Sequence, residues 1–259
     1  MTGLPIVCLH GWGMRGGIFG GVAEGLSLNK SWSDPHLLKL GSDHDLFPDL
    51  PGYGHTALPD DYSASELADR MAKDAPDKIV LLGWSMGSLI AQAWATRHPQ
   101  QVVALVLVAA TPCFQQRADW PYGLSVGDVA AFADGVASDW RATLNRFLAL
   151  QARGSEDARS LIAQLRAELA TGGDPRPETL AAGMRLLATT DLRDQAANIT
   201  QPTLLIHGAQ DGLCPLSGAE WLTAQMPNAR LKIIERAAHA PFLSHPGAFN
   251  ALLREFLNG

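Results

Sequence analysis

The hydrophobic positions of this chain form two alternating patterns. Short, continuous runs of Val, Ile and Leu indicate strands buried on both faces, and apolar residues three or four positions apart indicate amphipathic helices between them. The runs predict strands at residues 6–9, 79–82, 102–108, 203–207 and 231–234. Helices are predicted at residues 67–73, after a capping box at Ser63 and Glu66, and at residues 86–97, before Pro99. This alternation predicts an α/β fold, a mostly parallel sheet flanked by helices.

The pattern changes after about residue 112, where strand signals disappear. Three helical segments are predicted there, at residues 126–151, 156–170 and 177–189. Gly154 and Gly172 mark the breaks between them. We therefore expect residues 1–112 and 192–259 to form one core domain, and residues 113–191 to form a helical cap, or lid, inserted into it. Such a cap can cover the edge of the sheet where a ligand binds.

One predicted turn between a strand and a helix carries a candidate nucleophile. The sequence there is Gly83-Trp84-Ser85-Met86-Gly87. A G-x-S-x-G elbow holds its serine in a strained backbone conformation at the end of a strand, and the glycines remove side chains that would collide. The alternative is an ordinary turn that contains a serine. The distinction depends on whether the chain also supplies a base and an acid.

Two downstream loops contain such groups. Asp211 follows the predicted strand 203–207, and His239 follows the predicted strand 231–234. A serine hydroxyl needs an adjacent base, and the base needs an acid to orient it; the order Ser, Asp, His is that of α/β hydrolases. Taken singly, the aspartate before a glycine is also a common turn former and the histidine could be solvated. We interpret His207 and His245 as structural residues.

An acyl-transfer reaction also requires backbone N–H groups that stabilise the oxyanion. Met86 follows the nucleophile and supplies one N–H, and Trp12, in the loop after the first strand, supplies the second while its ring lines the acyl pocket. His10 is interpreted as an orienting structural residue. The chain contains no phosphate loop, dinucleotide fingerprint or metal-binding helix motif, so we expect neither a cofactor nor a metal.

Composition and charge exclude several other classes of protein. The 259 residues are 47% hydrophobic and 18% charged, which is ordinary for a globular protein, and no apolar run is long enough for a membrane span. The first strand begins too early to leave room for a signal peptide, so we expect a cytoplasmic protein. We also expect a monomer. The net charge of −6 argues against nucleic-acid binding. Cys8, Cys113 and Cys214 have neither a disulfide pattern nor zinc spacing.

These residues resemble the α/β-hydrolase superfamily and, within it, the pimeloyl-[acyl-carrier protein] methyl ester esterases of biotin synthesis. The general motifs are Leu9-His10-Gly11, Asp49-Leu50-Pro51-Gly52-Tyr53-Gly54 and the serine elbow. The more specific ones are His10-Gly11-Trp12-Gly13, Gly83-Trp84-Ser85-Met86-Gly87, Thr111-Pro112-Cys113-Phe114, Trp120-Pro121, Arg146-Phe147-Leu148-Ala149-Leu150-Gln151, Asp211-Gly212-Leu213 and Ala237-Ala238-His239-Ala240-Pro241-Phe242. The segment in the predicted cap carries the most weight, because caps usually diverge within the superfamily.

The resemblance implies an α/β-hydrolase fold and hydrolysis of the methyl ester of a pimeloyl chain on acyl-carrier protein. Ser85, Asp211 and His239 match the catalytic triad, and Trp12 and Met86 match the oxyanion positions. The acyl-binding positions fall on Trp12, Phe147, Leu148, Ala149, Leu150 and Gln151. For Phe147, Leu148 and Leu150, ordinary helix packing is the alternative.

The resemblance also implies a partner, because acyl-carrier protein is acidic and its esterase should present a cationic surface. Arg146 and Arg159 match positions that dock the carrier, but two further arginines of the pattern fall on Ala142 and Ala163. Exposed arginines on a solvated helix face are the alternative interpretation.

The chain departs from the pattern near its start. It lacks two strands before residues 6–9, the stretch 27–48 is long and less strand-like, and Pro48 is unsuited to a central strand, so we expect a shorter sheet edge. The leading hypothesis is a serine carboxylesterase for short to medium acyl esters. The alternatives are a broad carboxylesterase without carrier specificity, another hydrolase-fold chemistry such as carbon–carbon hydrolysis or perhydrolysis, and a non-catalytic small-molecule receptor.

Overall fold

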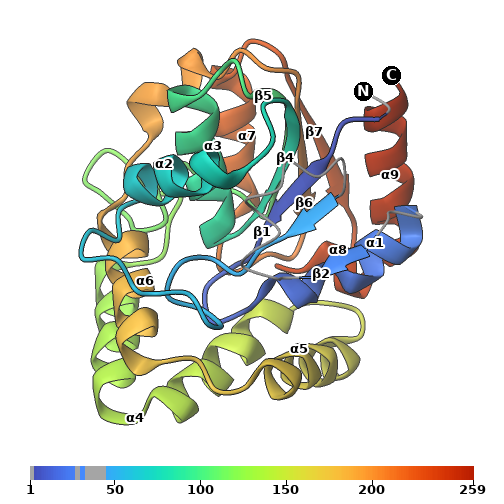
Figure 1. Cartoon of the computed structure of the whole chain (residues 1–259). Helices are drawn as coiled ribbons and strands as arrows, with labels where there is room; N and C mark the ends of the chain where they lie inside the picture. Colours follow the sequence, from blue (N-terminus) through green and yellow to red (C-terminus); the bar gives the residue numbers. More distant parts are fainter. Residues whose placement is uncertain (1–2, 27–29, 33–44) are drawn as a thin grey trace.

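The structure, a computed structural model, describes residues 3–26, 30–32 and 45–259. Within these residues a seven-stranded sheet runs in the order β2-β3-β1-β4-β5-β6-β7, and every neighbouring pair is parallel (Figure 1). The strands are β1 Ile6–Leu9, β2 Lys30–Trp32, β3 Asp45–Phe47, β4 Ile79–Trp84, β5 Val102–Val108, β6 Thr203–Gly208 and β7 Ala229–Ile234. The predicted parallel sheet is confirmed.

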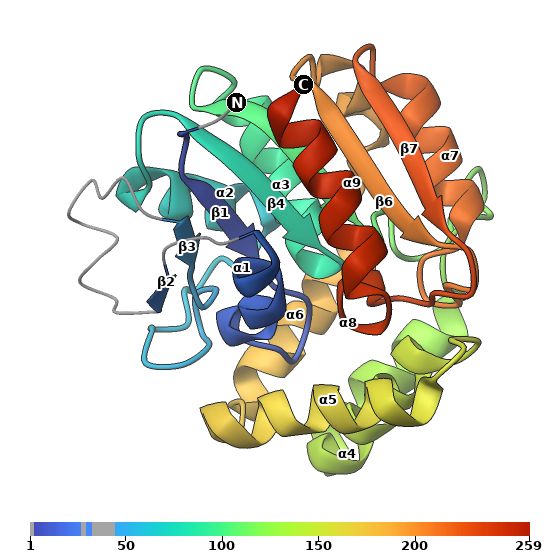
Figure 2. The ribbon, with the colours of Figure 1, turned by 90° about the vertical axis from the view of Figure 1, so that its right-hand side faces the viewer.

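Helices cover both faces of the sheet. They are α1 Gly20–Leu26, α2 Ala64–Asp74, α3 Met86–Arg97, α7 Leu216–Gln225, α8 Pro241–Ser244 and α9 Pro246–Asn258, with 3₁₀ turns η1 Gly16–Phe19 and η3 Arg193–Asn198. Figure 2 shows α1 and α9 in front of the strands, with α2, α3 and α7 behind them. Successive residues of β4 serve opposite faces: Leu81 packs in the cluster that includes α2 and α3, and Val80 and Leu82 pack in the cluster that includes α1 and α9. This double burial explains the unbroken apolar runs.

Three helices separate β5 from β6 in the chain: α4 Val126–Ala152, α5 Ala158–Gly172 and α6 Pro177–Thr189. We call them the cap helices. They lie together beyond the carboxyl ends of the strands, and α4 packs against both α5 and α6 (Figures 1 and 2). The chain leaves and re-enters the core at one place, because Leu192 N donates to Pro112 O (2.9 Å) and Cys113 is bridged to Asp191. The division into a core and an inserted cap stays a prediction that this arrangement supports.

The long helix α4 is interrupted at Asp139, whose φ of −149° and ψ of 86° are not helical. Its side chain explains the interruption: Asp139 Oδ1 accepts from Ala142 N (3.0 Å), as an N-cap residue does at the start of a helix. Thr143 Oγ1 donates to the Asp139 carbonyl oxygen (2.9 Å) across the bend. The hydrophobic pattern predicted one continuous helix here, because apolar spacing does not distinguish an internal cap from a surface aspartate.

The edge formed by β2 and β3 also differs from the expectation. Neither strand was predicted; β3 pairs with β1, and β2 pairs with β3. Pro48 follows β3 directly and so lies outside the sheet, which removes the conflict with strand hydrogen bonding. The rest of the stretch at issue, residues 27–29 and 33–44, lies outside the described residues. Across the part of the chain that is described, no helix combines the length and apolarity needed to cross a bilayer.

Candidate active site

Ser85 lies in the sharp turn between β4 and α3, with a φ of 56° and a ψ of −120°. Residues with a side chain rarely adopt a positive φ, and tight packing of the two flanking glycines keeps this turn in place. A Cβ on Gly83 would lie 2.5 Å from Gly87 O, and a Cβ on Gly87 would collide with Leu9 O. Ser85 N donates to Val108 O (3.0 Å) at the end of β5. The turn therefore holds Ser85 at the carboxyl edge of the sheet.

The two other residues of the predicted triad reach the same edge from the ends of β6 and β7. His239 Nε2 lies 2.8 Å from Ser85 Oγ, and His239 Nδ1 lies 2.8 Å from Asp211 Oδ2. His239 is fully buried, and Ser85 and Asp211 are each 7% exposed. A carboxylate only accepts, so Nδ1–H donates to Asp211 and Nε2 is left to accept from the serine hydroxyl. This is the geometry that a serine nucleophile requires.

Asp211 is held as a charged group. Its Oδ1 accepts from Leu213 N and Cys214 N, both at 2.9 Å. Burial by itself raises the pKa of Asp211, but the attraction of His239 and the hydrogen bonds to the carboxylate outweigh it, so the pKa lies below its ordinary value. The carboxylate is therefore ionised at neutral pH, as it must be to stabilise an imidazolium.

The main chain of His239 is fixed on both sides. His239 N donates to Gln151 O (3.1 Å) at the end of α4, and His239 O accepts from the indole Nε1 of Trp84 (2.8 Å). Trp84 is the residue directly before the nucleophile, and its ring centroid lies 5.8 Å from that of His239. The same residue therefore ends the strand that presents the serine and anchors the loop that presents the base.

The site contains the two backbone N–H groups that were predicted as oxyanion donors, those of Trp12 and Met86. Met86 N is the first amide of α3 and has no acceptor within the helix. Among the described residues no acceptor is found for Met86 N or Trp12 N. The loop that carries Trp12 lies against the nucleophile, since a Cβ on Gly11 would be 3.2 Å from Ser85 Cβ. Both predicted oxyanion donors therefore stay available beside Ser85.

The Trp12 side chain joins this loop to the cap helices. Its Nε1 donates to Leu180 O on α6 (2.9 Å), and its ring packs edge-on against Phe147 of α4, with centroids 4.8 Å apart. A Cβ on Gly183 of α6 would lie 2.6 Å from Trp12 Cδ1 and 3.3 Å from Met86 Sδ. The rings and side chains beside the oxyanion donors are thus packed directly against α4 and α6.

His10 connects the oxyanion loop to the loop after β3. Its Nδ1 donates to Gly11 O (2.9 Å) and its Nε2 accepts from Leu50 N (2.9 Å). Burial lowers the pKa of His10 to about 4, so the ring is neutral at neutral pH. Tyr53 packs edge-on against it, with centroids 4.8 Å apart, and Tyr53 Oη accepts from Gly13 N (3.0 Å). With both nitrogens engaged, His10 supports the loop and is not placed as a second base.

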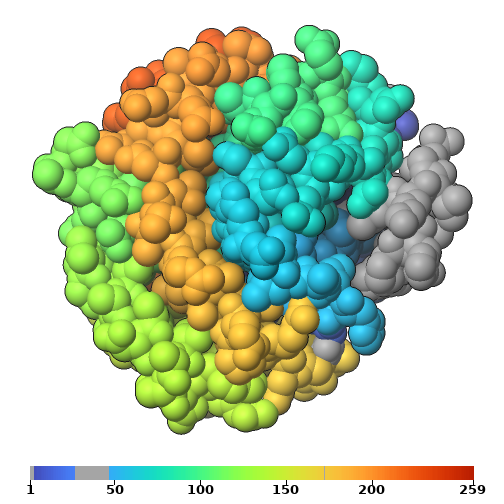
Figure 3. Space-filling view, turned by 60° about the vertical axis from the view of Figure 1, so that its left-hand side comes forward, coloured from blue at the N-terminus to red at the C-terminus, as the bar shows by residue number. Residues whose placement is uncertain are grey.

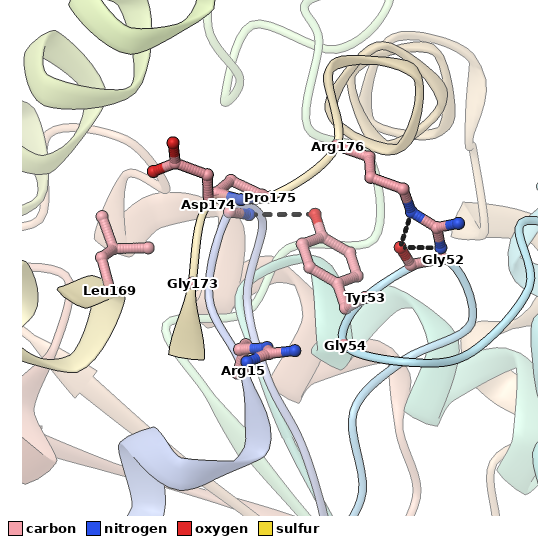
Figure 4. A pocket seen from close by; sticks show the side chains of 10 residues that line it. Arg15, Gly52, Tyr53, Gly54, Leu169, Gly173, Asp174, Pro175 and Arg176 are labelled. Carbon is pink, nitrogen blue, oxygen red and sulfur yellow. Dashed lines mark hydrogen bonds between the residues drawn. The ribbon is translucent and has the colours of Figure 1, made fainter. Parts of the chain in front are cut away.

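A small polar pocket lies where the oxyanion loop, the loop after β3 and the start of α6 meet (Figure 4). Arg176, the residue before α6, donates to Gly52 O and Thr56 O, and Thr179 Oγ1 donates to Gly52 O at 2.8 Å. Arg15 on the core side is paired with Asp49 (3.4 Å). The bonds from Arg176 and Thr179 tie the start of α6 to the loop after β3. Figure 3 shows that the surfaces of α6 and of this loop are continuous.

The predicted acyl-binding segment 147–151 is divided between different surroundings. Phe147 is buried between Trp12 and Phe132, and Leu150 is half-buried against the same cluster. Leu148 packs in the other cluster, with Leu161 and Leu165 of α5. Ala149 is exposed, because a helix cannot turn five consecutive residues to one side, so it lies on the outer face of α4. Gln151 is buried and reaches the site through its carbonyl bond to His239.

The predicted docking arginines lie on the outer surface of the cap helices. Arg146 is exposed on α4 with its guanidinium 5.3 Å from the Phe132 ring centroid, and Arg159 is exposed on α5. Within the described residues neither has a carboxylate partner. By contrast, Arg141 pairs with Asp174, and Arg166 Nε donates to Asn145 Oδ1 (3.2 Å). Ala142 and Ala163 are exposed where the resemblance has arginines.

The sequence interpretation did not predict two contacts made by residues of the triad. Trp84 was quoted only as part of the elbow motif, and its indole Nε1 donates to His239 O. His207 was interpreted as structural, and its Nε2 lies 3.5 Å from Asp211 Oδ2, four residues later in the chain. A spacing of four residues does not by itself indicate that two side chains meet. Within the residues described, no group of three or more His, Cys, Asp or Glu side chains is arranged to hold a metal ion.

Comparison with known proteins identifies similar chains. A family model for the alpha/beta hydrolase fold matches residues 5–246. The pimeloyl-[acyl-carrier protein] methyl ester esterase of Nitrosomonas europaea is 40% identical, with 96% of this chain and 93% of that protein covered. The enzyme of the same name from Aeromonas hydrophila is 39% identical, with 98% and 96% covered. Among solved structures, an esterase from Exiguobacterium antarcticum superposes with a TM-score of 0.80 at 25% identity, with 99% of this chain and 92% of that chain covered.

Proposed function

Because the chain belongs to the α/β-hydrolase fold family, and within it to the pimeloyl-[acyl-carrier protein] methyl ester esterases, we propose that it hydrolyses the methyl ester of a pimeloyl chain carried on acyl-carrier protein. The observation that carries the catalytic part of this proposal is the unbroken line from Ser85 Oγ through His239 to Asp211, with both contacts at 2.8 Å. The identity to full-length esterases carries the substrate part.

In the first half of the reaction Ser85 Oγ attacks the ester carbonyl carbon while His239 Nε2 takes the hydroxyl proton. The carbonyl electron pair moves to the oxygen, and the N–H groups of Trp12 and Met86 stabilise that oxyanion. Collapse of the intermediate breaks the bond to the methoxy oxygen, which receives the proton from His239 and leaves as methanol. The acyl group remains on Ser85 as an ester.

In the second half a water molecule attacks the acyl-enzyme and gives its proton to His239. The same two N–H groups stabilise the second oxyanion, and collapse returns the proton to Ser85 Oγ and releases the chain as a carboxylic acid, which gives its remaining proton to the solvent. Asp211 holds the imidazole in the tautomer that accepts at Nε2 and stabilises the imidazolium that forms in each half. Every proton and electron pair is accounted for by these three side chains and water.

The acyl chain would lie against the apolar side chains between the oxyanion loop and the cap helices. Trp12, Phe147 and Leu150 supply apolar surface there, and the Trp12 ring is held in place by its bond to Leu180 O. We include Gln151 because it is buried and adjacent to His239. Leu148 contributes to the packing of α5. Ala149 is exposed and is not part of this proposal.

The carrier would dock on the cap helices through Arg146 and Arg159. Both are exposed and, among the described residues, free of carboxylate partners, so they can meet an acidic protein without first breaking an ion pair. The second candidate function is a broad carboxylesterase without carrier specificity. It is favoured by Ala142 and Ala163, and by Arg141, whose charge is already matched by Asp174.

A cytoplasmic monomer completes the proposal. Cys113 and Cys214 are buried and form no disulfide within the described residues, as expected for a protein of a reducing compartment.

The test compares hydrolysis of pimeloyl-carrier methyl ester with that of a free short-chain methyl ester. Ser85→Ala should lower kcat on both by at least about 10⁴-fold, because nothing else at the site replaces the nucleophile. The pair Arg146→Glu with Arg159→Glu should lower kcat/KM about tenfold or more on the carrier-bound ester alone. The control pair, Lys73→Glu on α2 with Arg230→Glu on β7, reverses two exposed charges away from the cap helices and makes the same change in net charge.

Each proposal can be contradicted separately. Equal responses of both esters to the Arg146 and Arg159 reversals would mean a broad carboxylesterase. Turnover of a chromogenic butyrate ester that disappears in Ser85→Ala would exclude a non-catalytic receptor, and turnover that survives in Ser85→Ala would contradict the nucleophile.

A further inference from the structure

A second buried histidine stands behind the acid of the proposed triad. His207 is the fifth residue of β6 and is fully buried. Its Nε2 lies 2.7 Å from Cys214 O and 3.5 Å from Asp211 Oδ2. The reaction described above does not use His207, so the reason for a polar ring at this position has to be found in these contacts.

The contacts determine how the ring is protonated. A carbonyl oxygen only accepts, so Nε2 carries the proton that points toward Cys214 O. Nδ1 is buried and has no partner among the described residues. Burial, the largest effect, lowers the pKa of His207, which keeps the ring neutral, with one donor in use and one nitrogen unused.

The bonded carbonyl belongs to the loop that holds the acid. Cys214 O accepts from His207, and the amides of Leu213 and Cys214 donate to Asp211 Oδ1. At the start of the same loop Asp211 N donates to Gly208 O (3.2 Å). His207 thus ties the far end of the loop to the strand that begins it, and the amides of that far end hold the carboxylate.

Packing alone does not account for this residue. A phenylalanine would fill much of the same space without leaving a ring nitrogen buried and unpaired, and an unpaired buried nitrogen is unfavourable. What the imidazole supplies and an apolar ring cannot is the Nε2–H donor. The ring also lies beside the carboxylate, with Nε2 3.5 Å from Asp211 Oδ2, the oxygen that receives His239 Nδ1–H.

We propose that His207 is a positioning residue that holds Asp211 in line with His239: its Nε2–H binds the Cys214 carbonyl and so fixes the loop whose amides bind the carboxylate. This proposal rests on the proposed function in one respect, that Asp211 acts through His239 in catalysis. His207 touches neither the nucleophile nor the position of the substrate, so its effect should appear in kcat and in the Asp211–His239 hydrogen bond, and much less in KM.

The variants separate the donor from the ring. His207→Phe removes the donor and keeps a ring. His207→Gln places an amide N–H near the position of Nε2, whereas the amide of His207→Asn is one bond shorter and cannot reach Cys214 O. Thr203→Val is the matched control: Thr203 is buried at the other end of β6 and also donates to a backbone carbonyl, that of Gln201 (2.9 Å).

The first readout is turnover of a chromogenic butyrate ester per active site. His207→Phe and His207→Asn should each lower kcat about tenfold with KM changed less than about twofold, and His207→Gln should stay within about threefold of the wild type. In an Asp211→Asn background, adding His207→Phe should lower kcat by less than a further factor of about two, because the effect of His207 passes through Asp211. Thr203→Val should leave kcat within about twofold.

The second readout is the low-field proton resonance of the hydrogen bond between His239 Nδ1 and Asp211, which needs no substrate. It should be kept in His207→Gln and lost or moved upfield in His207→Phe and His207→Asn. Three results would overturn the proposal. The first is an equal loss of kcat in His207→Gln, His207→Asn and His207→Phe, and the second is a loss in His207→Phe that adds fully to that of Asp211→Asn. The third is a resonance that stays unchanged in His207→Asn and His207→Phe. If His207→Phe does not fold, the Gln and Asn pair decides. A wild type inactive on every ester would contradict the proposed function, and the resonance would still decide the role of His207.

Discussion

Trp84 links the stability of the core to the placement of the proposed base, so Trp84→Phe should lower both stability and activity. The indole Nε1 donates to His239 O at 2.8 Å, and both residues are fully buried. Phenylalanine keeps an aromatic ring between β4 and α8 but removes the donor. The carbonyl of His239 would then be buried without a partner at the base of the catalytic loop.

The size of the stability loss follows from two contributions. An unsatisfied buried carbonyl costs about 1–3 kcal/mol, and the smaller ring leaves space beside Phe242, whose ring centroid lies 5.1 Å from that of Trp84. Together they give about 2–4 kcal/mol. For a domain near this size each kcal/mol lowers Tm by roughly 2–4 °C, so the expected loss of Tm is about 5–15 °C.

The activity loss follows from the position of His239. Both of its catalytic contacts are 2.8 Å long, and a misplacement of about 1 Å can cost on the order of 10²-fold in rate. The loop keeps its second anchor, the bond from His239 N to Gln151 O, so the displacement should be partial. We expect kcat on a chromogenic butyrate ester to fall by about 10- to 100-fold with little change in KM.

Trp94→Phe is the matched control. Trp94 on α3 is fully buried, and its Nε1 donates at 2.8 Å to Gln101 Oε1, away from the site. The same chemical change should lower Tm while kcat stays within about twofold. Thermal unfolding by circular dichroism and kcat per titrated active site give the two values. The reasoning is refuted if Trp84→Phe loses no more activity than Trp94→Phe, or if its Tm does not fall.

Two further outcomes are expected. First, the folded pKa of His10 is lowered from 6.5 to about 4, so the unfolded chain binds an extra proton between those pH values. The free energy of unfolding should fall by about 3 kcal/mol as the pH drops over that range, and urea unfolding of His10→Gln should lack this component. Second, a Cβ on Gly183 would lie 2.6 Å from Trp12 Cδ1, so Gly183→Ala should lower kcat about tenfold, whereas Gly21→Ala, with nothing within 4 Å, should not. Equal rates would show that the Trp12 ring does not set the oxyanion loop.

The sequence predicted those features that depend on local backbone preferences and on order along the chain. The apolar runs identified five of the strands, because a strand buried on both faces has to be apolar throughout. The glycines around Ser85 indicated the elbow, because the turn excludes side chains there. Parallel strands end at one edge, so the order of Ser85, Asp211 and His239 at three strand ends was enough to predict that they meet.

Other features could not be predicted from the pattern, because the relevant partners are distant in sequence. Trp84 and His239 are 155 residues apart, and Trp12 and Leu180 are 168 residues apart. A motif indicates which residue types are present and not which donor faces which carbonyl. The resemblance likewise treated residues 147–151 as one lining segment, whereas the helical twist turns Ala149 outward.

By itself, then, the sequence determined the parallel α/β fold, the family and the three residues of the proposed triad. The tertiary structure alone decided how that triad is held: the Cys214 carbonyl bonded to His207, the His239 carbonyl bonded to Trp84, and Trp12 tied to α6. The physical reason is that strands and turns follow from conformational preference and burial, which each segment encodes locally. The orientation of a buried hydrogen bond depends on where packing places its partner from elsewhere in the chain.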